Sequence, residues 1–297
     1  MNTLAAPPRI CRYLGVTLAC VMMTVGVCVA GAGGSTAVHR IESHAVAGNR
    51  MGISTLRTLF VYTPEGYADS RRLYPVIYWI PGWETPASNE YVGALDEAIA
   101  DEWLGPVIVV TIDVREGVLM LNSPVFGNWA DFLVEEVVPF IDGEYRTIAS
   151  PKGRALMGHS TGGYAVMLLP LLYPGVWSAV GLNDASVWGA CNWRALEPPA
   201  DFSEYPSLEG QTQAWTQIGI ATSPDMELPR LFSLPFDPGA GPEVRAAWAS
   251  RCLTKVETLR TYRDALAQLS AIGIAVPVPG EWSNRSANLS MAEASGR

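Results

Sequence analysis

The residues of this sequence best suited to chemistry form the run Gly158-His159-Ser160-Thr161-Gly162. This run matches G-x-S-x-G, the pattern of a turn that presents a serine nucleophile between a strand and a helix. Glycine is required on both sides because a Cβ there would block the neighbouring backbone. A glycine-rich turn that only opens a helix is the alternative. Apolar stretches at 155–157 and 164–169 favour the first interpretation, with Ser160 as a nucleophile for acyl transfer.

The elements that position this serine are expected to alternate between strands and helices. Apolar stretches predict strands at 53–62, 74–80, 106–114, 155–157, 179–182 and 272–278. Helical spacing predicts helices at 91–103, 128–141, 164–169, 243–252 and 255–272. In the helix at 128–141, Glu135 and Glu136 are expected to face solvent. This alternation predicts an α/β fold with a mostly parallel sheet flanked by helices.

Residues 187–242 interrupt the alternation because they are rich in proline and tryptophan. We interpret them as an excursion over the carboxyl edge of the sheet, where ligand sites of α/β folds lie. Their tryptophans, Trp188, Trp193 and Trp215, would either line an apolar pocket or pack the excursion onto the body.

The N-terminal residues 1–32 are expected to be a signal peptide. Arg9 and Arg12 precede an apolar stretch at 13–32 that ends in small residues. We therefore expect the protein to be secreted or periplasmic, with an uncleaved membrane anchor as the alternative. Residues 36–276 would form the folded domain, and 277–297 an irregular tail without secondary structure.

Charge and cysteine content exclude several classes of partner. The net charge of −9 argues against nucleic acid and against an anionic membrane surface. Outside residues 1–32 only Cys191 and Cys252 remain, and they would either pair or stay as two buried thiols. No C-x-x-C or histidine cluster is present, so we expect neither a metal nor another cofactor.

At this point several landmarks, in order, resemble a known family. They are the segments 61–67, 74–82, 132–145 ending in Val138-Pro139-Phe140-Ile141, and 158–164 followed by Tyr173-Pro174. Together they resemble the α/β-hydrolases of the esterase D type, which include feruloyl esterases, S-formylglutathione hydrolases, enterochelin esterases and secreted mycolyltransferases. The resemblance covers roughly residues 40–275 and implies an α/β-hydrolase fold.

The resemblance also implies roles for the residues that match. Ser160 would be the acyl-accepting nucleophile, and the backbone N–H groups of Thr161 and Trp83 would form the oxyanion hole. Trp83 follows Gly82, the glycine of the family's oxyanion loop, and Pro81 stands before this glycine where family members often have His or Asp. Glu281 is a weak candidate for the acid, one residue beyond the expected position.

No general base is found among the histidines. The family order runs serine, acid, histidine, but the sequence contains only His39, His44 and His159, all before Ser160. His159 is expected to pack beside the nucleophile, and the other two to lie far from it. Three further acids, Asp184, Asp225 and Asp237, are expected in surface or capping roles.

These observations lead to an exported serine esterase that cleaves a small-molecule or cell-envelope carboxylic ester or thioester through an acyl-Ser160 intermediate. The lack of a triad histidine would cripple its turnover, through an interrupted reading frame or a natural truncation. Transfer of the acyl group to a sugar hydroxyl is one alternative. A non-catalytic protein that binds a carbohydrate or lipid ester is the other. Lack of the last helix and strand of the family fold would also leave the strand at 272–278 with an open edge, which favours association.

Overall fold

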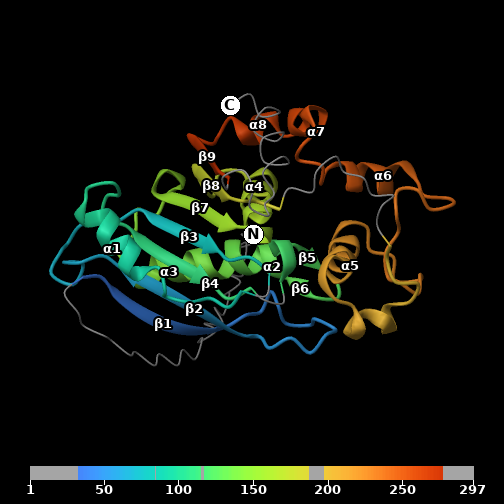
Figure 1. Ribbon diagram of the computed structural model, residues 1–297, viewed down its shortest axis with the longest axis horizontal. Helices are drawn as coiled ribbons and strands as arrows, with labels where there is room; N and C mark the ends of the chain where they lie inside the picture. The colour runs from blue at the N-terminus through green and yellow to red at the C-terminus, as the bar shows by residue number, and fades with distance from the viewer. Residues whose placement is uncertain (1–32, 84, 115–116, 187–196, 277–297) are drawn as a thin grey trace, which may run out of the picture.

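A computed structural model describes residues 33–83, 85–114, 117–186 and 197–276 of the chain (Figure 1). Its centre is a seven-stranded sheet in the order β1-β2-β4-β3-β7-β8-β9. The strands are β1 Ser35–Glu42, β2 Leu56–Thr63, β3 Val76–Ile80, β4 Ile108–Ile112, β7 Arg154–His159, β8 Ala179–Asn183 and β9 Ala271–Ala275. Only the β1–β2 and β2–β4 pairs are antiparallel. The predicted mostly parallel sheet is therefore confirmed.

The central strands were predictable because both faces of the sheet are covered. All five residues of β4 are buried, and β3 alternates between buried and half-buried positions. By contrast, the edge strand β1 was not predicted. None of its residues is buried, and polar or charged residues occupy most of its positions, so it lacks the apolar signal of a central strand.

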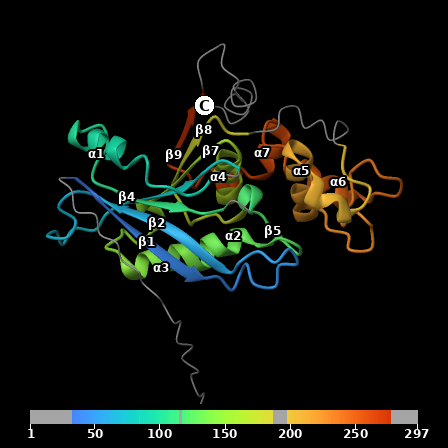
Figure 2. The same ribbon diagram turned by 60° about the horizontal axis from the view of Figure 1, so that its bottom comes forward.

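Helices cover the two faces of the sheet. Figure 2 shows α1 (Val92–Ala100) and α3 (Val138–Glu144) on opposite sides. Helix α1 packs against a small cluster formed by Tyr62, Val107 and Val109. On the other face lie α2 (Trp129–Asp131), a π-helix (Phe132–Val137), α3 and α4 (Thr161–Leu172), whose buried side chains belong to the main core.

The helix predicted at 128–141 is present as three consecutive helical segments, and the expectation for Glu136 is wrong. Its Oε1 accepts hydrogen bonds from the backbone N–H groups of His44 and Ala45, both at 2.8 Å. These groups lie just after β1 and have no strand partner, so a carboxylate from the neighbouring helix satisfies them. Glu135 is exposed, as expected.

The excursion lies beyond the carboxyl ends of the parallel strands, as Figure 1 shows. It contains a 3₁₀ helix (Phe202–Ser207) and α5 (Gly210–Thr222), which was not predicted because its polar residues and two glycines hide the helical pattern. The chain continues through α6 (Pro242–Ala249), α7 (Val256–Thr261) and α8 (Arg263–Leu266). The single helix predicted at 255–272 is therefore two short helices, and it stops before β9.

Shorter elements connect these parts. They are the 3₁₀ turns Val118–Met120 and Pro151–Gly153 and the two-stranded β5 (Asn122–Ser123) and β6 (Gly127–Asn128). Within the described ranges, no helix combines the length and apolar character needed to cross a bilayer. The expected signal peptide and the expected tail at 277–297 both lie outside those ranges.

Candidate active site

Ser160 lies on the turn between β7 and α4, with φ 53° and ψ −120°. A positive φ is uncommon for a non-glycine residue and costs on the order of 1–3 kcal/mol, so the surrounding structure must hold it. Two backbone hydrogen bonds do so. The Ser160 N–H donates to the Asn183 carbonyl at 3.1 Å, and the Ser160 carbonyl accepts from the Ser186 N–H at 2.8 Å. The expected strand–turn–helix geometry is thus present.

The glycine pattern has a direct steric cause at Gly162. A Cβ on this residue would lie 2.2 Å from the carbonyl oxygen of Ile80 and 2.5 Å from that of Pro81. The start of α4 therefore packs backbone to backbone against the end of β3. A Cβ on Gly82 would similarly lie 3.3 Å from the Cβ of Ser160. The loop after β3 is in this way held directly against the serine.

This packing brings the two expected oxyanion donors to one pocket. Trp83 and Thr161 line it together with Ile80, Pro81, Gly82, Val114, Gly117, Leu119 and Gly162. Thr161 is the first residue of α4, so its N–H has no partner within the helix. In the described part of the chain, neither the Thr161 N–H nor the Trp83 N–H donates a hydrogen bond to another group. Both can therefore bind an oxygen that carries developing negative charge.

Sequence reasoning missed one residue at this site. The Oγ atoms of Ser160 and Ser186 lie 3.1 Å apart, within hydrogen-bond distance, and both side chains are partly buried. Ser186 follows β8, and no motif or spacing in the sequence marks it. Only the pairing of β7 with β8 brings it beside the nucleophile candidate.

Comparison with known proteins identifies the family to which the chain belongs. The profile of the family described as "Putative esterase" matches residues 51–229, more than half of the sequence. The chain belongs to this esterase family. An esterase of Mycobacterium tuberculosis strain H37Rv is 28% identical over 142 residues, which are 46% of this chain and 29% of that protein. An endo-1,4-beta-xylanase/feruloyl esterase of Xylanibacter ruminicola is 31% identical over 150 residues, 45% of this chain and 20% of that protein.

The chain thus spans less than a third of the length of these relatives. Among solved structures, a ferulic acid esterase superposes with a TM-score of 0.59 at 15% identity, covering 89% of this chain and 86% of that one. A likeness at this identity concerns the fold alone. Together with the sheet described above, it makes the fold that of an α/β-hydrolase.

Two histidines of the chain lie away from the serine, as expected. His39 is on β1, four positions across the sheet from β7. Its Nε2 is 2.5 Å from the Tyr145 hydroxyl, and its ring packs edge-on against Phe140. Burial lowers the pKa of His39 below its ordinary value, partly opposed by the charge of Glu144. His44 is exposed in the loop after β1.

His159 lies beside the nucleophile turn, as expected, although the residue as a whole is exposed: a Cβ on Gly82 would lie 3.3 Å from its Nδ1 and 3.3 Å from the Cβ of Ser160. It is the last residue of β7, and side chains alternate between the two sides of a strand. The neighbouring Gly158 is buried, so His159 is on the other side of the strand, where its ring lies against the loop that carries Gly82.

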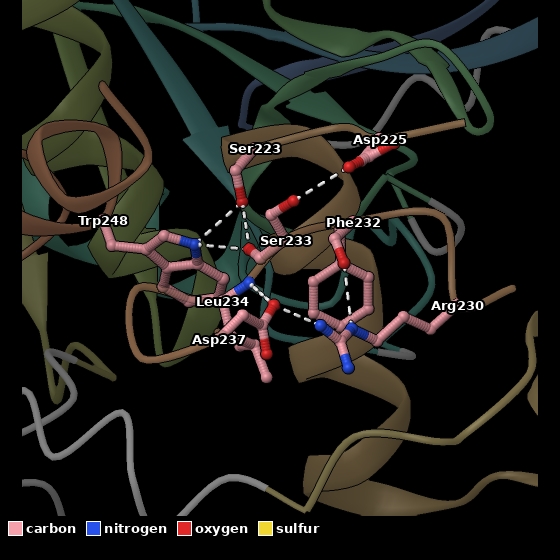
Figure 3. Close-up of polar contacts among 8 residues, drawn as sticks. All are labelled: Ser223, Asp225, Arg230, Phe232, Ser233, Leu234, Asp237 and Trp248. Atoms are coloured by element: carbon pink, nitrogen blue, oxygen red, sulfur yellow. Dashed lines mark hydrogen bonds and ion pairs between the residues drawn. The ribbon is translucent and has the colours of Figure 1, made fainter. Parts of the chain in front are cut away.

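Two of the three additional acids stabilise loops of the excursion, as Figure 3 shows. Asp225 accepts a hydrogen bond from the Ser233 hydroxyl at 3.1 Å. Asp237 forms an ion pair with Arg230 and accepts the Leu234 N–H at 2.6 Å. These contacts agree with capping roles.

Asp184 differs from that expectation. It directly follows β8, is only 8% exposed and has φ 43°, so it is not a surface residue. Its N–H donates to the Ala275 carbonyl at 2.9 Å, which ties the end of β8 to the end of β9. Glu281, the weak acid candidate, lies outside the described residues.

The tryptophans that the structure describes in and after the excursion contribute to packing. Trp215 is partly buried and packs against the main core, whereas Trp188 and Trp193 lie outside the described residues. Trp248 of α6 is fully buried, and its Nε1 donates to the Ser223 hydroxyl at 2.8 Å (Figure 3). Of the two alternatives for Trp215, packing of the excursion onto the body is therefore the one observed.

Cysteines and metal-binding groups complete the site description. Cys252 is disulfide-bonded, so the alternative of a free buried thiol is wrong for this residue, and Cys191 lies outside the described residues. Over the ranges that the structure describes, no group of three or more histidine, cysteine or acidic residues could hold a metal ion.

Proposed function

We propose that this member of the esterase family forms an acyl-enzyme at Ser160 with a carboxylic ester or thioester. One observation carries the proposal. A serine with φ 53° lies beside a pocket lined by Thr161 and Trp83, whose backbone N–H groups donate to no group among the described residues. A carbonyl oxygen bound by Thr161 and Trp83 would bring its acyl carbon to the serine hydroxyl. Each such donor contributes about 10²–10³ in rate.

The reaction begins with attack of the Ser160 oxygen on the acyl carbon. A bond from oxygen to carbon forms, the bond to the leaving alkoxide or thiolate breaks, and the serine proton is released. In a complete triad a histidine accepts this proton. Here His39 and His44 lie elsewhere, and among the described residues no histidine hydrogen-bonds to Ser160 Oγ. In this proposal water accepts the proton, which makes acylation slow.

The expected rate follows from this lack of a base. An oxyanion hole and substrate binding alone retain about 10³–10⁴ over the uncatalysed reaction. Loss of the serine or histidine of a triad costs on the order of 10⁶ in turnover. The lack of a base within the described site also favours a second candidate, a protein that binds an ester without turning it over. Transfer of the acyl group to a sugar hydroxyl would use the same acyl-enzyme.

The substrate and the compartment are also part of the proposal. The relatives and the superposed structure include proteins named as feruloyl and ferulic acid esterases. A small-molecule ester of an aromatic acid is therefore a reasonable second probe. Arg9 and Arg12 before an apolar stretch support export. N-terminal sequencing of exported protein should begin near residue 31–35, and an intact Met1 in cytosolic protein would contradict this.

The test of the acyl-enzyme is mass spectrometry after incubation with 4-nitrophenyl acetate and then with an ethyl ester of ferulic acid. We expect one acetyl group on Ser160 and none after Ser160→Ala. Ser203→Ala, at an exposed serine of the excursion, is the matched control and should label like the unmodified protein. Equal labelling of Ser160→Ala would contradict the proposal. Turnover on the order of 1 s⁻¹ or faster would mean that a base exists.

A further inference from the structure

The last residue of β8 and the three residues after it, 183–186, form a segment that we call the β8 strap. It contacts the serine turn at several points. Asn183 accepts the Ser160 N–H, and Ser186 both donates its N–H to the Ser160 carbonyl and places its hydroxyl 3.1 Å from Ser160 Oγ. In addition, a Cβ on Gly163 would lie 2.7 Å from the Cβ of Ala185.

The backbone bonds and the hydroxyl contact do different things. The two backbone hydrogen bonds fix the φ and ψ of Ser160, but they leave its side chain free to rotate about one torsion with three staggered positions. Among the described residues, the contact with Ser186 is the only side-chain hydrogen bond of Ser160 Oγ. It therefore selects one of those three positions.

The strap is itself held in place. Asp184 has a positive φ of 43° and is almost fully buried, and its N–H donates to the Ala275 carbonyl at 2.9 Å. Strain of this kind persists only where the surroundings fix the backbone. Ser186 is consequently a fixed point against which the Ser160 side chain is aligned, rather than a mobile loop residue that happens to lie near.

We propose that Ser186 is a positioning residue for acylation at Ser160. This inference rests on the proposed function. In this proposal the Ser160 hydroxyl is the donor of the pair, which leaves a lone pair of Ser160 Oγ free for the acyl carbon, and the proton leaves to water as the bond to carbon forms. When the Ser160 oxygen becomes an ester, it has no proton to donate and the contact is released. Ser186 does not touch the substrate.

Substitution of Ser186 isolates this contact because the Ser186 N–H bond does not depend on the side chain. Ser186→Ala removes the hydroxyl, Ser186→Cys keeps the size with a much weaker hydrogen-bonding group, and Ser186→Thr keeps the hydroxyl. A hydrogen bond of this kind contributes about 0.5–1.5 kcal/mol, which corresponds to roughly a 2- to 12-fold change in rate.

The experiment measures acetylation of Ser160 by 4-nitrophenyl acetate over a range of concentrations, which separates the acylation rate constant from apparent binding. We expect Ser186→Ala and Ser186→Cys to lower the rate constant roughly 3- to 10-fold at unchanged apparent binding and melting temperature. Ser186→Thr should restore most of the rate. A purely structural role would instead change the melting temperature and spare the rate constant of the folded protein.

Other outcomes would overturn the inference. If Ser186→Ala and Ser186→Cys acylate at the rate of the unmodified protein, or faster, while Ser160→Ala does not label, then Ser160 remains the nucleophile and Ser186 does not position it. If Ser160→Ala labels as well as the unmodified protein, the proposed function itself fails, and the role of Ser186 fails with it. Should Ser186→Ala not fold, the comparison of Ser186→Cys with Ser186→Thr decides.

Discussion

Replacing Gly162 by alanine would place a Cβ 2.2 Å from the carbonyl oxygen of Ile80 and 2.5 Å from that of Pro81. To reach a van der Waals distance, the start of α4 and the end of β3 would have to separate by at least about 1 Å. Overpacking of this kind typically costs about 1–3 kcal/mol of unfolding free energy. In a domain of this size, each kcal/mol lowers the melting temperature by roughly 2–4 °C.

The same movement would also affect chemistry, because the loop after β3 carries Trp83. A displacement of about 1 Å at a reacting centre can cost about 10² in rate. We therefore expect Gly162→Ala to melt several degrees lower and to acylate Ser160 about 100-fold more slowly, as measured by thermal unfolding and by 4-nitrophenyl acetate labelling.

A matched control exists in α1. Gly93 is the second residue of its helix, as Gly162 is of α4, but a Cβ there would meet no atom within 4 Å. Gly93→Ala should be neutral or stabilise by up to about 1 kcal/mol. If Gly162→Ala has the same melting temperature as Gly93→Ala and is labelled at the rate of the unmodified protein, the close approach of β3 to α4 is incorrect.

Three further predictions concern stability and association. Glu136→Ala should lower the unfolding free energy in urea by about 1–3 kcal/mol because two backbone N–H groups lose their acceptor, whereas Glu135→Ala should change it by less than about 0.5 kcal/mol; equal effects would contradict the contact. Since burial lowers the pKa of His39, the unfolded state binds its proton more readily, so stability should fall as the pH drops through 6.5, and His39→Gln should flatten this dependence; an equally steep fall in the variant would refute it. Among the described residues β9 is an edge strand and contains no charged residue, so we expect the protein to self-associate on size-exclusion chromatography, and Gly273→Lys, for which the nearest atom lies 3.8 Å from the new Cβ, to reduce association; a monomeric unmodified protein at micromolar concentration would contradict this.

The parts of the fold that were predictable are those where the local sequence and the tertiary environment agree. The central residues of strands β3, β4, β7 and β8 are mostly apolar because helices cover both faces of the sheet, so the existence of these strands could be predicted. The edge strand β1 and the polar helix α5 carry no such signal. Element ends were displaced by a few residues, as in β4, where 106–114 was expected and Ile108–Ile112 is observed.

The site was predictable where it depends on residues close together in the sequence. The turn at Ser160 and the glycine requirement follow from five consecutive residues. The contact with Ser186 and the hydrogen bonds of Glu136 join residues 26 and about 90 positions apart, respectively, and only the folded chain brings them together. The exposure of His159 likewise depends on what covers the end of β7, which a sequence pattern does not contain.

The β8 strap has a consequence for the order in which the protein folds. The unfavourable φ of Ser160 is held by hydrogen bonds to Asn183, the last residue of β8, and to Ser186, three residues further on, so both are synthesised after the whole of α4. Until those residues emerge and pair, the turn has no reason to adopt its native conformation, and the serine can relax to ordinary backbone angles. Ser160 therefore reaches its native backbone conformation late during synthesis, and a nascent chain would not hold it in that conformation before β8 has joined the sheet.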